Sequence, residues 1–198
     1  QWSGNSNLAY QIDEPSSQLV LTPDPYSNRI ALASKANTDD IDGAMWNGAF
    51  FDTVRYIDNS AYNTFAAGYT YTDIAWIGDT GTAVLNYWEN GVTGSISTGT
   101  YTPVVRAVAY TNTWADQGDT SISGFAEAFG RAMQSYTTSD KVMMLMHDTN
   151  SQLMSLIYEN GAWTVTNSGN PLTSQLSVTL GQPYVMSVKE PEIVLIDD

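Results

Sequence analysis

The chain has 198 residues, of which 42 % are hydrophobic and 14 % are charged, a composition typical of a folded globular protein. Its 21 acidic and 7 basic residues give a formal charge of −14, which disfavours nucleic acid and anionic membranes as partners. The absence of cysteine excludes disulfides, thiol catalysis and thiolate metal sites. The longest apolar runs, such as Val142–Met146, are too short to cross a bilayer, so membrane insertion is not expected.

A strand-like segment at residues 16–22 comes first, and three similar units follow it. Each unit has a β-like strand, a polar turn and a second apolar strand that ends near an aromatic residue, at Trp46, Trp88 and Tyr158. The first strands are Arg29–Ser34, Thr72–Ile77 and Lys141–Met146, and the turns after them are Asn37–Gly43, Gly78–Thr82 and Asp148–Gln152.

An Asn-Gly pair closes each unit, at Asn47, Asn90 and Asn160. This pair predicts a tight hairpin, because a type I′ turn needs a positive φ at both central residues. The 43-residue interval between the first two pairs matches the blade period of a β-propeller. We therefore expect one domain over residues 1–198, with repeat units at approximately 26–66, 67–110 and 137–169.

The longer interval before the third unit predicts an inserted α-helix at residues 119–136. Its apolar residues recur at helical spacing: Phe125, Ala128, Phe129, Ala132, Met133 and Tyr136. Ser123 can serve as the N-cap, and Glu127 lies near the positive end of the helix dipole. We expect the helix to cover the edge of a blade, with a partner interface as the alternative.

The strand-like C-terminal segment, residues 183–198, has two possible roles. It could pair with residues 16–22 to complete a fourth sheet, or it could be donated to a neighbouring subunit. The candidates for such assembly are Ile193, Val194, Leu195 and Ile196. The fold class expected from these elements is all-β, a propeller-like array of about four short antiparallel sheets with one α-helix. A two-sheet β-sandwich is the alternative.

The pattern of two strands followed by an aromatic residue and Asn-Gly resembles the blades of fucose-binding propeller lectins. It is also similar to the W-N-G-x-x-W repeats of secreted surface proteins. Residues Lys141–Thr164 carry the resemblance best, followed by Asp73–Gly91. The lectin resemblance implies sugar pockets made by an Arg on the second strand, a Glu on the third strand and an aromatic residue after the turn. In the third unit Trp163 fills the aromatic place, whereas apolar residues of Val142–Met146 stand at the Arg place.

Residues for catalysis or metal binding are few. His147 is the only histidine, which restricts every histidine-dependent mechanism to one copy, and we interpret it as a hydrogen-bonded residue at a strand end. Asp40 and Asp42 resemble the start of a calcium loop, but a hairpin turn explains them better because Ala49 stands where the terminal acid is needed. We therefore expect no catalytic residue, metal or cofactor.

The aromatic residues near the turns are the candidates for sugar stacking: Trp46, Trp88, Tyr158 and Trp163. Packing between adjacent sheets is the alternative for each of them. The predicted function is an extracellular, non-catalytic carbohydrate-binding protein, on the basis of the resemblance, the low content of charged residues and the Gln-Trp start. The alternative is a structural subunit of a filament, sheath or fibre assembled by strand exchange, and a two-carboxylate glycoside hydrolase is a remote third. The expected partners are glycans or further copies of the chain in a homo-oligomer.

Overall fold

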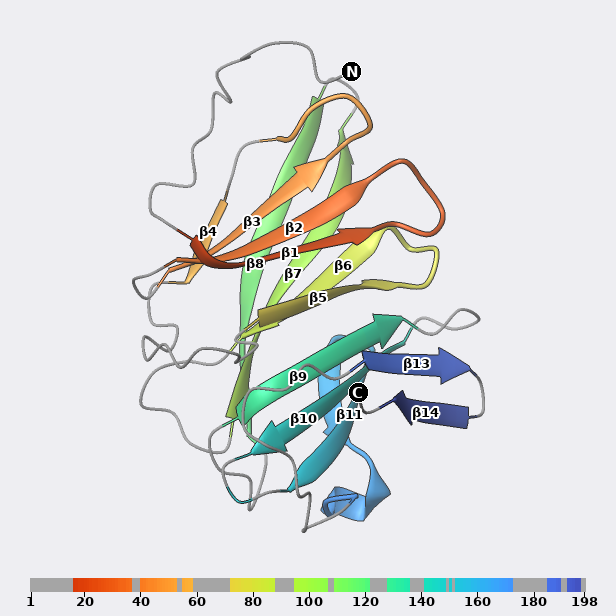
Figure 1. The fold of residues 1–198 in the computed structure, drawn as a ribbon. Helices are drawn as coiled ribbons and strands as arrows, with labels where there is room; N and C mark the ends of the chain where they lie inside the picture. The colour runs from red at the N-terminus through yellow and green to blue at the C-terminus, as the bar shows by residue number, and fades with distance from the viewer. Residues whose placement is uncertain are drawn as a thin grey trace.

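The computed structural model describes residues 16–36, 40–52, 55–58, 72–87, 95–106, 109–121, 128–135, 141–148, 150, 152–172, 185–189 and 192–196. These residues form three four-stranded antiparallel sheets and one two-stranded hairpin, stacked along the molecule (Figure 1). The expectation of an all-β array of small antiparallel sheets is thus confirmed. No helix within the described residues is long and apolar enough to cross a membrane.

Each sheet is built from strands that are consecutive in the sequence. The first sheet contains β1 (Ser16–Pro23), β2 (Ile30–Ala36), β3 (Ile41–Trp46) and β4 (Arg55–Asp58). The second sheet contains β5 (Thr72–Ile77), β6 (Thr82–Tyr87), β7 (Ser95–Arg106) and β8 (Ala109–Ser121). The third sheet contains β9 (Ala128–Ser135), β10 (Val142–Asp148), β11 (Leu153–Glu159) and β12 (Ala162–Val165). The terminal hairpin contains β13 (Val185–Lys189) and β14 (Glu192–Ile196).

The first two strands of the second sheet, β5 and β6, are buried on both faces, which explains their nearly continuous apolar runs. Ile74 and Trp76 of β5 point toward the first sheet, where they pack in one cluster with Ala31, Ala33, Ile41 and Met45. Ala75 and Val84 point the other way and pack against residues of the third sheet, namely Val142, Met144, Met146, Met154, Leu156, Tyr158 and Trp163. The alternation along β5 therefore separates two core layers.

Side chains of β1 bind the free backbone edge of β5. The Gln18 amide donates to the Thr72 carbonyl (3.0 Å) and accepts from the Thr72 N–H (3.2 Å). The Thr22 hydroxyl donates to the Ile74 carbonyl (3.0 Å), and the Trp76 indole N–H donates to the Thr22 carbonyl (2.9 Å). These side-chain hydrogen bonds satisfy backbone groups of Thr72 and Ile74 that have no neighbouring strand on this edge of β5.

The Asn-Gly corners differ in structure. Asn160 (φ 54°) and Gly161 (φ 85°) form the predicted two-residue turn between β11 and β12, where Glu159 pairs with Ala162. Asn47 instead begins a four-residue loop that ends in a bridge between Trp46 and Phe51. Asn90 lies outside the described residues.

The sheets divide the chain differently from the predicted repeat units. The predicted first strands coincide largely with β2, β5 and β10, but β5 is the first strand of its sheet whereas β2 and β10 are second strands. Residues 16–23 pair with β2 and so belong to the first sheet, and residues 192–196 pair with β13. The described residues therefore do not show the two terminal segments paired with each other. The predicted turn 37–43 is also shorter than expected, because β3 begins at Ile41, whose side chain is fully buried.

The predicted α-helix at residues 119–136 is wrong in its described part. Residues 109–121 and 128–135 are the strands β8 and β9, and residues 122–127 and Tyr136 lie outside the described residues. Within the described residues the one helical element is a 3₁₀ turn at Asn167–Gly169. Backbone pairing of β9 with β10, together with its position beside β5, replaces the intrahelical hydrogen bonds that the local pattern favoured.

Gly43 provides a test of the packing between the first and second sheets. A Cβ atom at this position would lie 2.6 Å from Cε2 of Trp114, which β8 places in the core cluster between the two sheets. We expect Gly43→Ala to lower the free energy of unfolding by about 1–3 kcal/mol, because the indole cannot withdraw without opening the cluster. Urea denaturation measures this loss.

Trp114→Phe is the control background for this test. If the clash with the indole causes the loss, Gly43→Ala should cost clearly less in the Trp114→Phe protein, and the two substitutions should be non-additive. An equal loss in both backgrounds would contradict the proposed contact.

Candidate carbohydrate-binding surface

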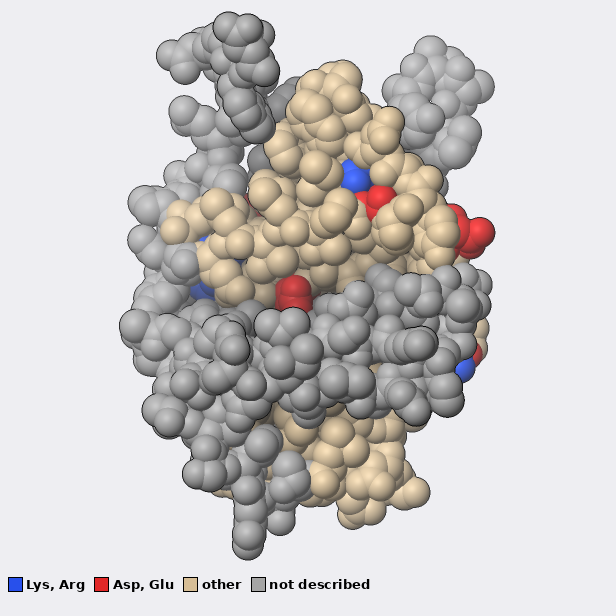
Figure 2. Space-filling view, turned by 45° about the vertical axis from the view of Figure 1, so that its right-hand side comes forward, with Lys and Arg blue, Asp and Glu red and all other residues tan. Residues whose placement is uncertain are grey.

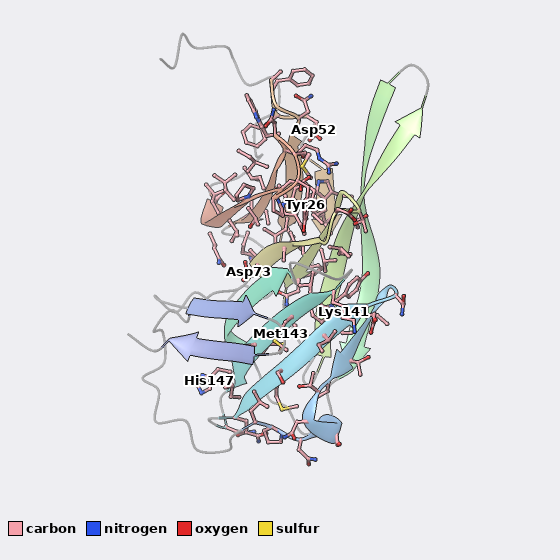
Figure 3. All side chains as sticks on the ribbon, turned by 90° about the vertical axis from the view of Figure 1, so that its right-hand side faces the viewer. Tyr26, Asp52, Asp73, Lys141, Met143 and His147 are labelled. Carbon is pink, nitrogen blue, oxygen red and sulfur yellow. The ribbon has the colours of Figure 1, made fainter. Side chains whose placement is uncertain are left out.

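Two loops lie side by side at one end of the first sheet, and we call this region the loop end. It comprises residues Asp24–Arg29, between β1 and β2, and Asn47–Phe50, which follow β3. A Cβ atom on Gly48 would lie 3.5 Å from Cβ of Asn28, which places the two loops in contact distance. Figure 3 looks toward this part of the molecule, with Tyr26 and Asp52 labelled.

Asp24 organises the first loop although it is almost fully buried. Its carboxylate accepts hydrogen bonds from the Tyr26 N–H (3.0 Å) and the Ser27 hydroxyl (2.6 Å), and it forms an ion pair with Arg29 (2.6 Å). Burial by itself raises the pKa of Asp24, but the bonds from Ser27, Tyr26 and Arg29 outweigh it, so the pKa lies below its ordinary value. Asp24 is therefore a stable carboxylate at neutral pH.

Arg29 joins this loop to the second sheet. Its guanidinium carbon lies 4.9 Å from the centre of the Trp76 ring, and Nη1 donates to the Gly81 carbonyl (3.3 Å). Gly81 has a φ of +73°, and a Cβ atom there would lie 2.5 Å from Nη2 of Arg29. These contacts commit Arg29 to holding the loop rather than to binding a ligand.

The second loop is organised by an amide side chain. Oδ1 of Asn47 accepts from the N–H groups of Ala49 (3.0 Å) and Phe50 (3.1 Å), and the Asn47 N–H donates to the Phe50 carbonyl (3.1 Å). Gly48 supplies the positive φ of 99° that the loop needs. Asp52 closes the loop, because its N–H and carboxylate bind the carbonyl and the N–H of Met45.

The loop end is rich in accessible aromatic surface. Phe50 is 61 % exposed and Tyr26 is 55 % exposed. Trp46 is half-buried, and its ring meets that of Phe51 edge to face at 5.3 Å. Asn28 and Asn47 are exposed in the same two loops. Flat apolar rings and nearby hydrogen-bonding groups suit a sugar ring, because C–H groups make one of its faces apolar whereas hydroxyl groups project from its rim.

The structure separates the four predicted sugar-binding residues. Trp46 is the last residue of β3, directly before the loop end, and Trp88 lies outside the described residues. Tyr158 and Trp163 are buried between the second and third sheets, where their rings meet edge to face at 5.2 Å. Burial also raises the pKa of the Tyr158 phenol. Stacking of a sugar on either of these two rings would require the core between the sheets to open.

Sequence reasoning missed Tyr26 and Phe50. Tyr26 stands in "TPDPYSNR", a run of turn-forming residues, and an exposed aromatic in such a turn is the signal that points to a surface role. His147, singled out as the only histidine, is buried in β10. Within the described parts of the chain, no group of three His, Cys, Asp or Glu residues could hold a metal ion.

The comparisons with known proteins identify a fold. No family model and no curated protein matches the chain. A fungal lectin from Aleuria aurantia, a six-bladed β-propeller with fucose recognition, is 11 % identical; the match covers 94 % of this chain and 55 % of the lectin, with a TM-score of 0.50. A mutant of that lectin in complex with Fucalpha1-6GlcNAc matches at 11 % identity over 89 % of this chain and 53 % of the lectin (TM-score 0.48). A fucose lectin from Kordia zhangzhouensis, in complex with methyl-fucoside, is 11 % identical over 76 % of this chain and 98 % of its own (TM-score 0.39).

The chain thus spans about half the length of the Aleuria aurantia lectin. At this level of identity the likeness concerns the fold alone. The likeness agrees with the resemblance inferred from the repeated strands and Asn-Gly turns. It also agrees with the series of small antiparallel sheets in this structure. The structure of this chain is therefore similar to that of the six-bladed β-propeller lectins.

The ion pair of Asp24 predicts a pH dependence of stability. We expect Asp24→Asn to lower the free energy of unfolding at pH 7 by about 2 kcal/mol, because Arg29 and Ser27 lose a charged acceptor. Since the pKa of Asp24 is depressed in the folded state, its contribution is present above the ordinary value of about 4 and is lost as the pH falls through the folded value. The difference between wild type and variant should therefore shrink on acidification.

Urea denaturation of both proteins at pH 7 and at acid pH measures this difference. Asp79→Asn, at an exposed carboxyl in the turn between β5 and β6, is the matched control and should show no comparable loss. A difference between wild type and Asp24→Asn that is constant with pH would refute the assignment.

Proposed function

We propose that the protein is a non-catalytic carbohydrate-binding protein that holds a sugar ring at the loop end of its first sheet. The observation that carries the proposal is that two adjacent loops present the exposed aromatic residues Tyr26 and Phe50 together with the exposed residues Asn28 and Asn47, next to the half-buried Trp46. The likeness to a lectin fold supports the class of ligand, and the fucose named for those lectins makes fucosylated glycans the first ligands to test.

Recognition would rest on stacking and amide hydrogen bonds. The arginine that the lectin resemblance implies has no free counterpart at the loop end, because Arg29 is engaged by Asp24, Trp76 and Gly81. Oδ1 of Asn47 accepts hydrogen bonds from the loop backbone, so the side-chain N–H groups of Asn47 are the donors that can bind a hydroxyl group of the sugar. We therefore propose binding through ring faces, with a wider tolerance for sugar type than an arginine pocket would allow.

Carbohydrate binding without catalysis fits the acidic residues of the loop end. A glycosidase needs one carboxyl group with a raised pKa to protonate the leaving oxygen. Asp24 has a lowered pKa and is covered by its own loop, and Asp52 is bound to the Met45 backbone. Assembly of a filament by strand exchange is less favoured than sugar binding, because β14 already pairs along its whole length with β13. The low content of charged residues leads us to place the protein outside the cell, as part of the same proposal.

Titration calorimetry against a panel of monosaccharides and fucosylated oligosaccharides tests the proposal. We expect Trp46→Ala and Phe50→Ala each to weaken binding about tenfold, the effect of removing 1–2 kcal/mol of ring contact. Tyr56→Ala is the matched control, because Tyr56 is an exposed aromatic on β4 of the same sheet, paired with Asp42 and away from the loop end. It should leave the affinity unchanged.

Two results would contradict the proposed function. One is the absence of heat with every sugar of the panel. The other is binding that survives both substitutions at the loop end, which would move the site elsewhere.

A further inference from the structure

The turn between β11 and β12 exposes an asparagine that is followed by glycine. Asn160 and Gly161 are its two central residues, and Glu159 pairs with Ala162 across it. All four residues are exposed. A Cβ atom built on Gly161 would have no atom within 4 Å, so the tip of this hairpin stands clear of its surroundings. Solvent therefore reaches both central residues of the turn.

An asparagine followed by glycine can lose its side-chain amide without an enzyme. Hydroxide removes the backbone proton of Gly161, and the nitrogen attacks Cγ of Asn160. A nitrogen–carbon bond forms, the bond from Cγ to the amide nitrogen breaks, and ammonia leaves after taking a proton from water, which restores the hydroxide. Water then opens the resulting five-membered succinimide at either carbonyl, to give aspartate or isoaspartate. Glycine favours the ring because it has no Cβ atom to crowd the attacking nitrogen.

The native turn must open before this ring can form. A residue in the left-handed conformation, such as Asn160 with a φ of 54°, holds Cβ roughly anti to the nitrogen of the next residue. The opening is local, because β12 has four residues and lies at the edge of the third sheet. The ends of such strands separate at a free energy below that of global unfolding. Among the described residues, no hydrogen bond holds the Asn160 side chain in place.

The Asn-Gly pair at Asn47 is held more firmly than the pair at Asn160. Oδ1 of Asn47 accepts from the N–H groups of Ala49 and Phe50, and the Asn47 N–H donates to the Phe50 carbonyl. A strand bridge closes the loop behind these bonds. The Asn47 amide must give up two hydrogen bonds before Cγ can reach the Gly48 nitrogen. The fold therefore protects one pair and leaves the other open to reaction.

Isoaspartate at Asn160 would disturb the pairing of β12. It routes the backbone through the former side chain, which adds one carbon atom to the main chain. A two-residue turn has no slack for that atom, because its geometry has to match the twist of both strands. β12 would lose its register on β11, and Trp163 of β12 is buried against Tyr158, with the ring centres 5.2 Å apart. A change at the exposed tip thus reaches the core layer between the second and third sheets.

Both products add a carboxylate next to an ion pair. Nζ of Lys141 lies 3.2 Å from Oε1 of Glu159, the residue before Asn160. Charged side chains are sparse on the described surface in the view of Figure 2, and one further negative charge joins a formal total of −14. The modified forms should therefore separate from the intact chain by anion exchange.

We propose that Asn160 is a site of spontaneous deamidation, and that the isoaspartate formed there loosens β12 while Asn47 stays largely intact. The hairpin thereby converts the chain, at a rate set by its own opening, into a second form with an altered third sheet. The proposal rests on the contacts of the two turns and is independent of sugar binding at the loop end.

Incubation of the full chain at mildly alkaline pH, followed by peptide mapping with mass spectrometry, tests the site. We expect the peptide that contains Asn160 to convert about tenfold faster than the peptide that contains Asn47, since opening the Asn47 loop breaks more hydrogen bonds. The rate should rise with pH, because hydroxide removes the Gly161 proton. Methylation by an isoaspartate methyltransferase identifies the isoaspartate product. In urea-denatured protein the two peptides should convert at similar rates, since each asparagine is followed by glycine.

Asn160→Gly is the matched variant, because a Gly-Gly pair accepts the same turn and has no amide to lose. Amide hydrogen exchange of β12 should become faster in wild-type protein after the incubation. It should stay unchanged in Asn160→Gly protein that is incubated in the same way. The comparison separates the effect of the modification from that of storage.

Four results would overturn the proposal. Conversion at Asn47 as fast as at Asn160 in the folded chain would mean that the fold does not select the site. The same difference between the two sites in urea would assign it to the flanking sequence. An Asn160 peptide that stays intact in the folded chain while the denatured chain reacts would mean that the hairpin does not open. Unchanged exchange of β12 after conversion would mean that the turn accommodates isoaspartate.

Discussion

The burial of β5 and β6 of the second sheet on both faces is the constraint on which the rest of the structure depends. Ile74 and Trp76 join one core layer, and Ala75 joins the other. A strand in this position has mostly apolar side chains on both sides, so most of its polar groups are those of its backbone. Gln18 and Thr22 satisfy these groups along the free edge of β5, which links the first and second sheets by directional bonds as well as by packing.

The two core layers differ in character. The layer toward the first sheet combines small alanines with large rings, and Gly43 makes room for the indole of Trp114. The layer toward the third sheet contains Met144, Met146 and Met154. Methionine adapts its shape to irregular gaps, so we expect this layer to tolerate changes of volume better than the first one does. The buried side chain of Asn86 reaches the sulfur of Met144 within it.

Arg29 connects this framework to the candidate surface. It holds Asp24 on one side and contacts Trp76 and Gly81 of the second sheet on the other. The same contacts that stack the sheets therefore fix the loop that carries Tyr26 and Asn28. Rigid sheets that support loops with exposed polar and aromatic residues are a common way to build a binding surface, because the ordering cost is met on folding.

The sequence by itself determined the features that arise from neighbouring residues. The Asn160-Gly161 turn follows from the φ angles that its two residues accept. The apolar runs at β5 and β10 indicate strands, and their continuity is typical of strands that are buried on both faces. The all-β class and the likeness to propeller lectins could both be predicted in this way. Tertiary structure alone decided that Ala128–Ser135 is a strand, because its hydrogen-bond partners on β10 lie elsewhere in the chain. It also decided that Tyr158 and Trp163 are buried whereas Trp46 is half-buried and Phe50 is exposed, since the exposure of a ring depends on which sheet lies opposite and not on its spacing from a turn.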